Sequence, residues 1–165
     1  MRIIAMLALL AATAGTAAMA ATPCAAPQFH QFDFWIGSWN VTSKDNEPAG
    51  VDKVESRVNG CALVETWEGK GGGTGVSLNY YDPEDGKWHQ EWVGTGARLH
   101  LVGGLEGERM VLAGGPRTTR KGTLVEDRIT WEPRPDGSVL QEWRVSPDRG
   151  KSWKVIFSGT YRKEE

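Results

Sequence analysis

A regular series of short alternating segments constrains the fold of this 165-residue chain more than any other feature. From Phe34 onward, apolar and polar residues alternate in runs rich in Val, Thr, Trp and Tyr, which is typical of β-strands. No apolar period long enough for a substantial helix interrupts them. We therefore predict an all-β chain of about ten strands, at residues 35–43, 52–58, 62–68, 75–82, 87–93, 98–103, 109–113, 124–132, 138–145 and 153–162.

The connections between these runs predict hairpins. Asn59-Gly60 suits a turn with positive φ, and residues 82–86 and 133–137 are turns rich in Pro and Gly. Short hairpins in chain order form a meander, and a meander of ten strands removes its exposed edges by closing into an up-and-down antiparallel β-barrel. A β-sandwich is the alternative. Residues 116–122, with Arg117, Arg120 and Lys121, are expected to form an exposed loop.

The N-terminal residues 1–20 have the pattern of a secretory signal. Arg2 precedes an apolar run at residues 3–12, and Ala18-Met19-Ala20 places small residues at a cleavage site. The run is too short to span a bilayer, although a membrane anchor is the alternative reading. We expect an exported protein, periplasmic or secreted, with an N-terminal segment at residues 21–33 and one barrel domain at residues 34–165.

The chain has two cysteines, Cys24 and Cys61. In an oxidising compartment they permit a single bridge, so we predict a Cys24–Cys61 disulfide that ties the N-terminal segment to the start of a strand. A reactive or metal-binding thiol pair is the alternative, and no Cys-x-x-Cys spacing supports it.

The charge distribution bears on the partners. The formal net charge is −2 and no basic block occurs, which argues against nucleic acid or an anionic membrane surface as the main partner.

Several blocks carry a family resemblance: Phe-Asp-Phe-Trp-x-Gly-x-Trp-x-Val at residues 32–41, and the blocks at residues 59–67, 75–82, 87–93, 146–153 and 159–162. They resemble a family of small secreted bacterial proteins, known as a domain of unknown function, that is similar to the lipocalin or calycin barrels. The resemblance covers nearly all of the chain after the signal. It implies the barrel fold and supplies no catalytic residues.

The resemblance also implies a structural pair. In lipocalin-like barrels the Trp of Gly-x-Trp, here Trp39, closes one end of the barrel, and an Arg near the end of the last strand packs across its indole. Arg162 is the residue expected in that position, so both residues are interpreted as structural.

Strand alternation identifies candidate residues for the interior of the barrel. Aromatic rings supply apolar surface and a glutamine amide orients a polar group, so a small hydrophobic or amphipathic ligand is the expected occupant. The candidate ligand-binding residues are Trp88, Gln90, Trp92, Gln141 and Trp143. The alternative is that these side chains only fill the core. Two further sets share one strand face each and point either into the lumen or toward solvent: Glu65 and Trp67, and Ser77, Asn79 and Tyr81.

The histidines give little support for a cofactor. His89 and His100 lie on neighbouring predicted strands near Glu91, but they lack a close third ligand, so we expect no metal. Related barrels that bind haem use a His late in the chain, whereas His100 is the last one here, so we expect no haem. Residues 75–79 do not form a nucleophile elbow, which argues against a serine hydrolase.

Three functions remain open from the sequence. The first is a carrier that binds a small molecule in the barrel. The second is an envelope interaction scaffold with a filled barrel, which the lack of a cavity would favour. The third is an enzyme that uses polar lumen residues such as Glu65 or His89, which requires paired titratable groups in one pocket. No catalytic residue is assigned.

Overall fold

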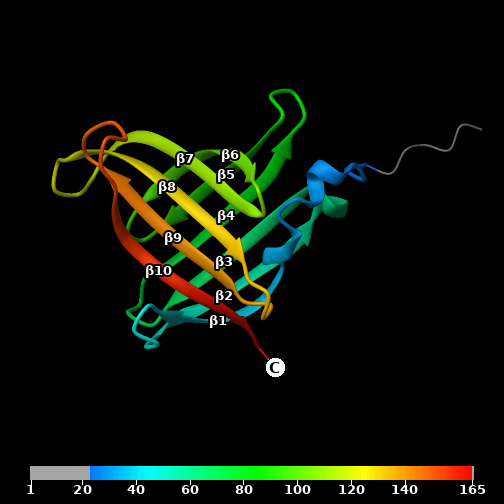
Figure 1. Cartoon of the computed structure of the whole chain (residues 1–165), viewed down its shortest axis with the longest axis horizontal. Coiled ribbons are helices and arrows are strands. Elements are labelled where there is room, and N and C mark those ends of the chain that lie inside the picture. The colour runs from blue at the N-terminus through cyan, green and yellow to red at the C-terminus, as the bar shows by residue number, and fades with distance from the viewer. Residues whose placement is uncertain (1–22, 165) are drawn as a thin grey trace, which may run out of the picture.

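The computed structural model describes residues 23–164, and the predicted signal at residues 1–20 lies outside the described residues. The chain forms one closed antiparallel barrel in which each strand pairs with the next, and the last strand pairs with the first (Figure 1). The strands are β1 (Gly37–Ser43), β2 (Pro48–Arg57), β3 (Ala62–Gly69), β4 (Thr74–Asp82), β5 (Lys87–Gly94), β6 (Arg98–Glu106), β7 (Arg109–Thr118), β8 (Leu124–Pro133), β9 (Val139–Ser146) and β10 (Lys154–Lys163).

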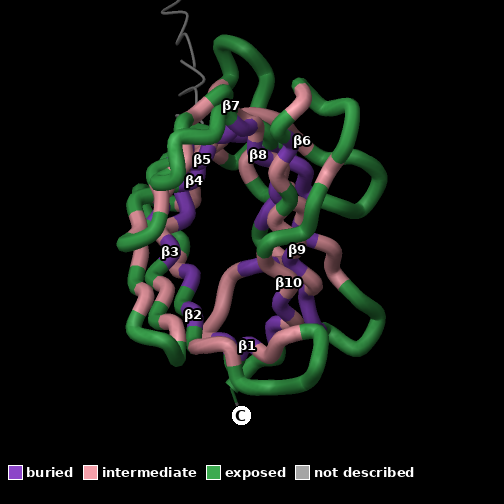
Figure 2. The backbone as a smooth tube through the Cα atoms, turned by 90° about the vertical axis from the view of Figure 1, so that its left-hand side faces the viewer, coloured by how far each residue is buried: buried purple, intermediate pink, exposed green. Residues whose placement is uncertain are grey.

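Closure of the sheet confirms the barrel and excludes the sandwich alternative. Trp39 of β1 lies opposite both Asp52 of β2 and Lys163 of β10, so β1 has a partner on each side. Figure 2 shows the strands arranged as a ring, with buried segments between exposed loops. Inward positions alternate with outward ones along each strand, as the sequence pattern predicts.

The prediction for residues 116–122 is wrong in its first half. Strand β7 resumes its pairing with β8 after a register shift, at Arg117↔Val125 and Thr118↔Leu124, so only the residues after Thr118 form the loop. Arg117 is half-buried and forms an ion pair inside the barrel wall. The sequence alone does not predict this extension of β7, because Gly114, Gly115 and Pro116 interrupt the alternation. The register with β8 shows that pairing resumes.

The N-terminal segment closes one end of the barrel, where it is drawn in blue (Figure 1). It contains two 3₁₀ helices, η1 (Pro27–His30) and η2 (Asp33–Trp35), and a third, η3 (Val58–Gly60), connects β2 to β3. Phe32 stacks on Trp35 at 4.9 Å and contacts Trp88 and Trp131 edge-on at 5.6 and 5.1 Å. All four side chains are almost fully buried, so this end of the barrel is filled.

The predicted Cys24–Cys61 disulfide is present and joins the N-terminal segment to the start of β3. Asn59 and Gly60 both have positive φ, as the turn prediction requires. Within residues 23–164, none of the helices has the length and apolar character needed to cross a membrane.

Trp39 is completely buried and its Nε1 donates a hydrogen bond to the carbonyl of Trp35 at 3.0 Å. The cation over its indole ring is Lys163, at 5.5 Å from Nζ to the centroid, and not Arg162 as expected. Lys163 is the direct cross-strand partner of Trp39, whereas Arg162 is one residue away and therefore faces outward, where it donates to Thr42 Oγ1.

Candidate ligand-binding cavity

The other half of the barrel contains a cavity of about 160 Å³. The residues that line it are Glu65, Trp67, Gln90, Trp92, Leu99, Ile129, Gln141, Trp143, Phe157 and Tyr161. Trp67, Trp92 and Trp143 also line a wider hollow of about 730 Å³ at the mouth of the barrel. The aromatic rings therefore form the entrance, and the polar side chains form the floor. The barrel is filled at one end and hollow at the other.

Strand alternation brings the lining residues together. Glu65 and Trp67 are two positions apart on β3, as are Gln90 and Trp92 on β5, and so are Gln141 and Trp143 on β9. Each pair points inward, because side chains two apart lie on the same face. Ser77 of β4 lies opposite both Glu65 and Trp92, which connects the first two pairs around the barrel.

Four of the five candidate residues line this cavity: Gln90, Trp92, Gln141 and Trp143. The fifth, Trp88, faces inward at the filled end, where its Nε1 donates to Gln31 Oε1 at 3.2 Å. Alternation places Trp88 and Trp92 on one face of β5, but the cavity reaches only the end of the strand that carries Trp92. The two polar sets left open from the sequence face inward: Glu65, Ser77 and Asn79 are buried, and Tyr81 packs edge-on against Phe29.

The polar floor contains a directed chain of hydrogen bonds. Gln90 Nε2 donates to Asn79 Oδ1 at 2.8 Å, Asn79 Nδ2 donates to Ser77 Oγ at 2.8 Å, and Ser77 Oγ donates to Glu65 Oε2 at 2.5 Å. On the opposite side Tyr161 donates its hydroxyl proton to Gln141 Oε1 at 2.5 Å. These bonds fix the orientation of both glutamines. Among the described residues, no side-chain hydrogen bond involves the other atom of either amide, Gln90 Oε1 or Gln141 Nε2.

Two carboxyl groups inside the barrel have strongly raised pKa values. Burial raises the pKa of Glu65 to about 7, although the hydrogen bond from Ser77 opposes the shift. Burial, and secondarily the charge of Glu65, raises the pKa of Asp52 to about 9. Tyr161 has a pKa well above 10 because it is buried and lies near both acids. These three titratable groups therefore interact across the interior.

Asp52 is a functional candidate that the sequence reasoning did not single out. Only 2% of it is exposed, and neither carboxyl oxygen has a hydrogen-bond partner among the described residues. Its cross-strand partners Trp39 and Trp67 also face inward. A sequence signal was available, since Asp52 is two residues from buried Val54 and so shares its strand face.

The carboxylate of a third acid in the barrel, Asp127, has both a cationic partner and hydrogen-bond donors. Arg117 donates to it twice and Trp143 Nε1 donates to its Oδ1 at 2.7 Å. The guanidinium carbon of Arg117 also lies 5.7 Å from the centre of the Trp143 ring. The ion pair thus holds one aromatic wall of the cavity in place.

The comparisons with known proteins add no identity to this geometry. No protein-family model matches the chain, and no curated protein matches its sequence.

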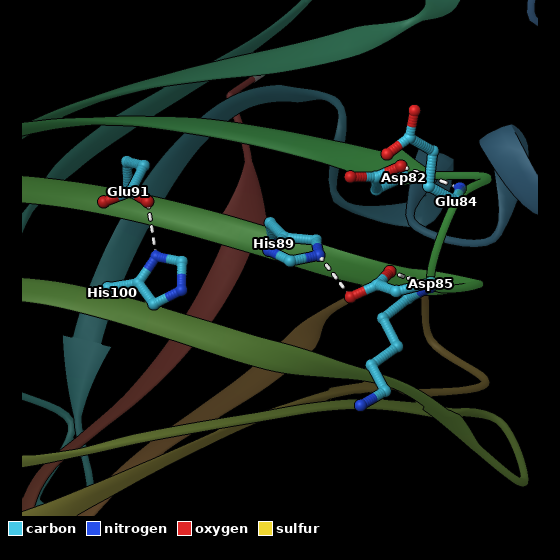
Figure 3. A network of polar contacts seen from close by, with 7 residues as sticks. Asp82, Glu84, Asp85, His89, Glu91 and His100 are labelled. Atoms are coloured by element: carbon cyan, nitrogen blue, oxygen red, sulfur yellow. Dashed lines mark hydrogen bonds and ion pairs between the residues drawn. The ribbon is translucent and has the colours of Figure 1, made fainter.

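The histidines lie away from the cavity. Figure 3 shows His89 and His100 side by side on β5 and β6, where His100 bonds to Glu91 and His89 Nε2 lies 3.1 Å from Asp85 Oδ2. His89, Asp82 and Asp85 offer ligand atoms within 4.8 Å of one another, a grouping that His100 does not join. The two aspartates also accept backbone hydrogen bonds in the β4–β5 turn, which accounts for their orientation toward the turn.

Proposed function

We propose that this chain is an exported, lipocalin-like barrel, of the secreted family that its sequence blocks resemble, which binds a small hydrophobic or amphipathic molecule. The observation that carries the proposal is the cavity itself. Its volume of about 160 Å³ matches the size at which an engineered protein cavity accepts benzene. Aromatic walls around a few convergent polar groups are the usual composition of a small-molecule site.

The cavity favours a carrier over an interaction scaffold. A scaffold needs only a filled barrel, and the filled end shows that aromatic residues of this chain can pack with almost no exposed surface. At the other end Trp67, Trp92 and Trp143 remain only partly buried around a hollow that continues to the mouth. Leaving large apolar rings partly unburied costs stability, which supports a ligand as their partner.

Export is supported by two features. The disulfide between Cys24 and Cys61 is typical of proteins in oxidising compartments. The residues before it carry the basic, apolar and small-residue pattern of a secretory signal. The periplasm and the extracellular medium both fit these features.

Native mass spectrometry of the full chain, exported by its own N-terminal segment, tests the proposal. We expect a reproducible mass excess that disappears when the same sample is denatured. In parallel, a neutral naphthylamine dye should bind with a saturable change in fluorescence. Binding should weaken at least fivefold in W92L, because the substitution removes a ring of the cavity wall, and should be unchanged in W153L.

Trp153 is a suitable control because it lies outside the cavity lining, and its Nε1 donates a hydrogen bond to Gly150 O. A bare polypeptide mass together with no saturable dye binding overturns the carrier function. Equal binding by W92L and W153L overturns the assignment of the site.

A second candidate function, proton-transfer catalysis, is favoured by one observation. Glu65 lines the cavity with a pKa of about 7, which suits a general base at neutral pH. Its carboxylate would remove a proton from a carbon next to a carbonyl group and return it to the same or a neighbouring carbon. Solvent deuterium incorporation into a bound ketone, lost in E65Q, is the expected result. Equal incorporation by E65Q excludes this role.

A further inference from the structure

The interior of the barrel has an excess of acidic groups without basic partners. Asp52 and Glu65 take part in none of the ion pairs formed by residues 23–164, and Asp52 also lacks hydrogen bonds to its carboxyl oxygens. By contrast, Asp127 has Arg117 as a bidentate partner. Buried charges in proteins are normally paired. The fold therefore supplies a cation for one buried acid and none for the other two.

The hydrogen bonds of the floor point toward Glu65. Each donor in the chain from Gln90 through Asn79 to Ser77 faces the next residue in the direction of the Glu65 carboxyl group. Aligned donors favour the ionised form of the acid at their end, and each bond strengthens the next. The site is thus built to hold a carboxylate once a positive group offsets the cost of burying it.

The walls suit an organic cation. Trp67, Trp92, Trp143 and Phe157 line the cavity next to Glu65, and Trp67 and Phe157 meet edge-on at 5.9 Å. The faces of aromatic rings attract ammonium groups, most strongly where water is excluded. A cavity that accepts a benzene-sized group has room for a trimethylammonium head, and the hollow at the mouth has room for an attached chain.

We propose that the cavity binds the ammonium head of a small organic amine or quaternary amine, with Glu65 as the counter-charge and the tryptophans as walls. This inference rests on the proposed carrier function and names its ligand class. Arg120, Lys121 and Lys154 line the mouth, so the outer end of the ligand is neutral or anionic and a second cationic end is disfavoured.

The test compares an alkyltrimethylammonium ion with its neutral tert-butyl isostere, both titrated into the full chain and followed by tryptophan fluorescence. At about pH 8 we expect the ammonium ion to bind about tenfold more tightly or better, from the cation–π and charge terms. Between about pH 6 and pH 8 its affinity should rise about tenfold, because Glu65 ionises around pH 7 and the bound cation requires the ionised form. The neutral isostere should not gain affinity.

Titratable groups other than Glu65 do not account for this pH dependence of binding. Asp52 of β2 and Tyr161 of β10 are the titratable groups on which the charge of Glu65 acts, and their raised pKa values keep both neutral up to about pH 8. Strand β4 presents Ser77 and Asn79, which do not titrate, and Asp127 is paired with Arg117. His89 and His100 alternate with buried inward residues and so lie on the outer face of β5 and β6.

The variant pair E65Q and E68Q completes the test. Both replace a glutamate of β3 by its neutral isostere, but Glu68 is exposed on the outer face. We expect E65Q to lose the preference for the ammonium ion and its pH dependence while still binding the tert-butyl compound, and E68Q to behave as the wild type. Equal affinity for the two compounds at about pH 8, or a preference retained in E65Q, overturns the ammonium inference alone. If neither compound nor the naphthylamine dye binds, the carrier function fails as well.

Discussion

Arg117 donates two hydrogen bonds to Asp127, from Nε to Oδ2 at 2.6 Å and from Nη2 to Oδ1 at 2.8 Å. The pair joins β7 to β8, and Asp127 is almost completely buried. Since Trp143 donates to the same carboxylate, the ion pair also sets the position of a cavity wall.

Removal of the guanidinium should therefore affect both stability and the site. We expect R117A to lower the free energy of unfolding by about 3 kcal/mol, because it leaves the buried Asp127 carboxylate without its cation. R128A is the matched control, since Arg128 contacts Glu106 at 3.3 Å with both side chains about half exposed, and should cost less than about 1 kcal/mol. Urea denaturation measures both values. Equal losses of unfolding free energy in R117A and R128A would show that the Arg117–Asp127 pair contributes no more to stability than an exposed ion pair.

The buried acids predict an unusual pH dependence of stability. In the unfolded chain Asp52 and Glu65 ionise near their ordinary pKa values of 3.8 and 4.5, whereas in the fold these rise to about 9 and about 7. The native state retains protons that the unfolded state releases. The stability contribution of these groups is thus intact below about pH 4 and is lost as the pH rises toward about 9.

We expect the free energy of unfolding to fall by roughly 6 kcal/mol between about pH 5 and pH 8 from these two groups, with Asp52 contributing the larger part. D52N should reduce this slope and stabilise the protein at about pH 8, because an amide has no proton to lose. D45N, in the exposed β1–β2 loop, should leave the slope unchanged. Denaturation curves across this pH range provide the measurement, and parallel slopes for D52N and the wild type would contradict the role of Asp52.

The disulfide provides a third prediction. The bond between Cys24 and Cys61 closes a loop of 37 residues, for which the loss of unfolded-state entropy corresponds to about 4 kcal/mol. The double variant C24S/C61S should be destabilised by about that amount and should expose the N-terminal segment to proteolysis. Denaturation midpoints of the variant and the oxidised wild type, with limited proteolysis, measure this. An unchanged midpoint would mean that the packing of Phe32 and Trp35 alone holds the N-terminal segment against the barrel.

The sequence predicted the fold well because its signals are local. The alternation of each strand and the Asn59-Gly60 turn depend on neighbours in the chain, and ten strands joined by hairpins have few ways to remove their edges. Arg117 shows the limit of this reasoning. Its strand is interrupted by Gly114 to Pro116, and only the register with β8 shows that pairing resumes.

The sequence predicted which strand face the site residues occupy, but not how far along the barrel axis they lie. Gln90, Trp92, Gln141 and Trp143 line one cavity as expected, whereas Trp88 on the same strand face packs against Phe32 at the filled end. The position of a residue along the barrel axis depends on the tilt and stagger of the closed sheet, which alternation does not encode. Asp52 escaped notice because an aspartate beside a lysine in a strand usually faces solvent.

Gly75 and Gly94 lie opposite each other on β4 and β5, and the indole of Trp92 covers both. A Cβ atom added at Gly75 would stand 2.3 Å from Cη2 and Cζ2 of Trp92, so the ring of any G75A variant must rotate. We expect G75A to lose at least fivefold in dye affinity while it loses only about 1–2 kcal/mol of stability, since the ring borders a cavity into which it can move.

The control is G104A on β6, where an added Cβ would meet nothing within 4 Å. It should match the wild type in dye affinity and in the near-ultraviolet circular dichroism of its tryptophans, whereas G75A should differ in both. The double variant G75A/W92L should bind no worse than W92L alone, because both substitutions act on the same ring and their effects cannot add. Additive losses of dye affinity in the double variant would mean that Gly75 acts through the backbone of β4. The position of the Trp92 ring would then not depend on Gly75.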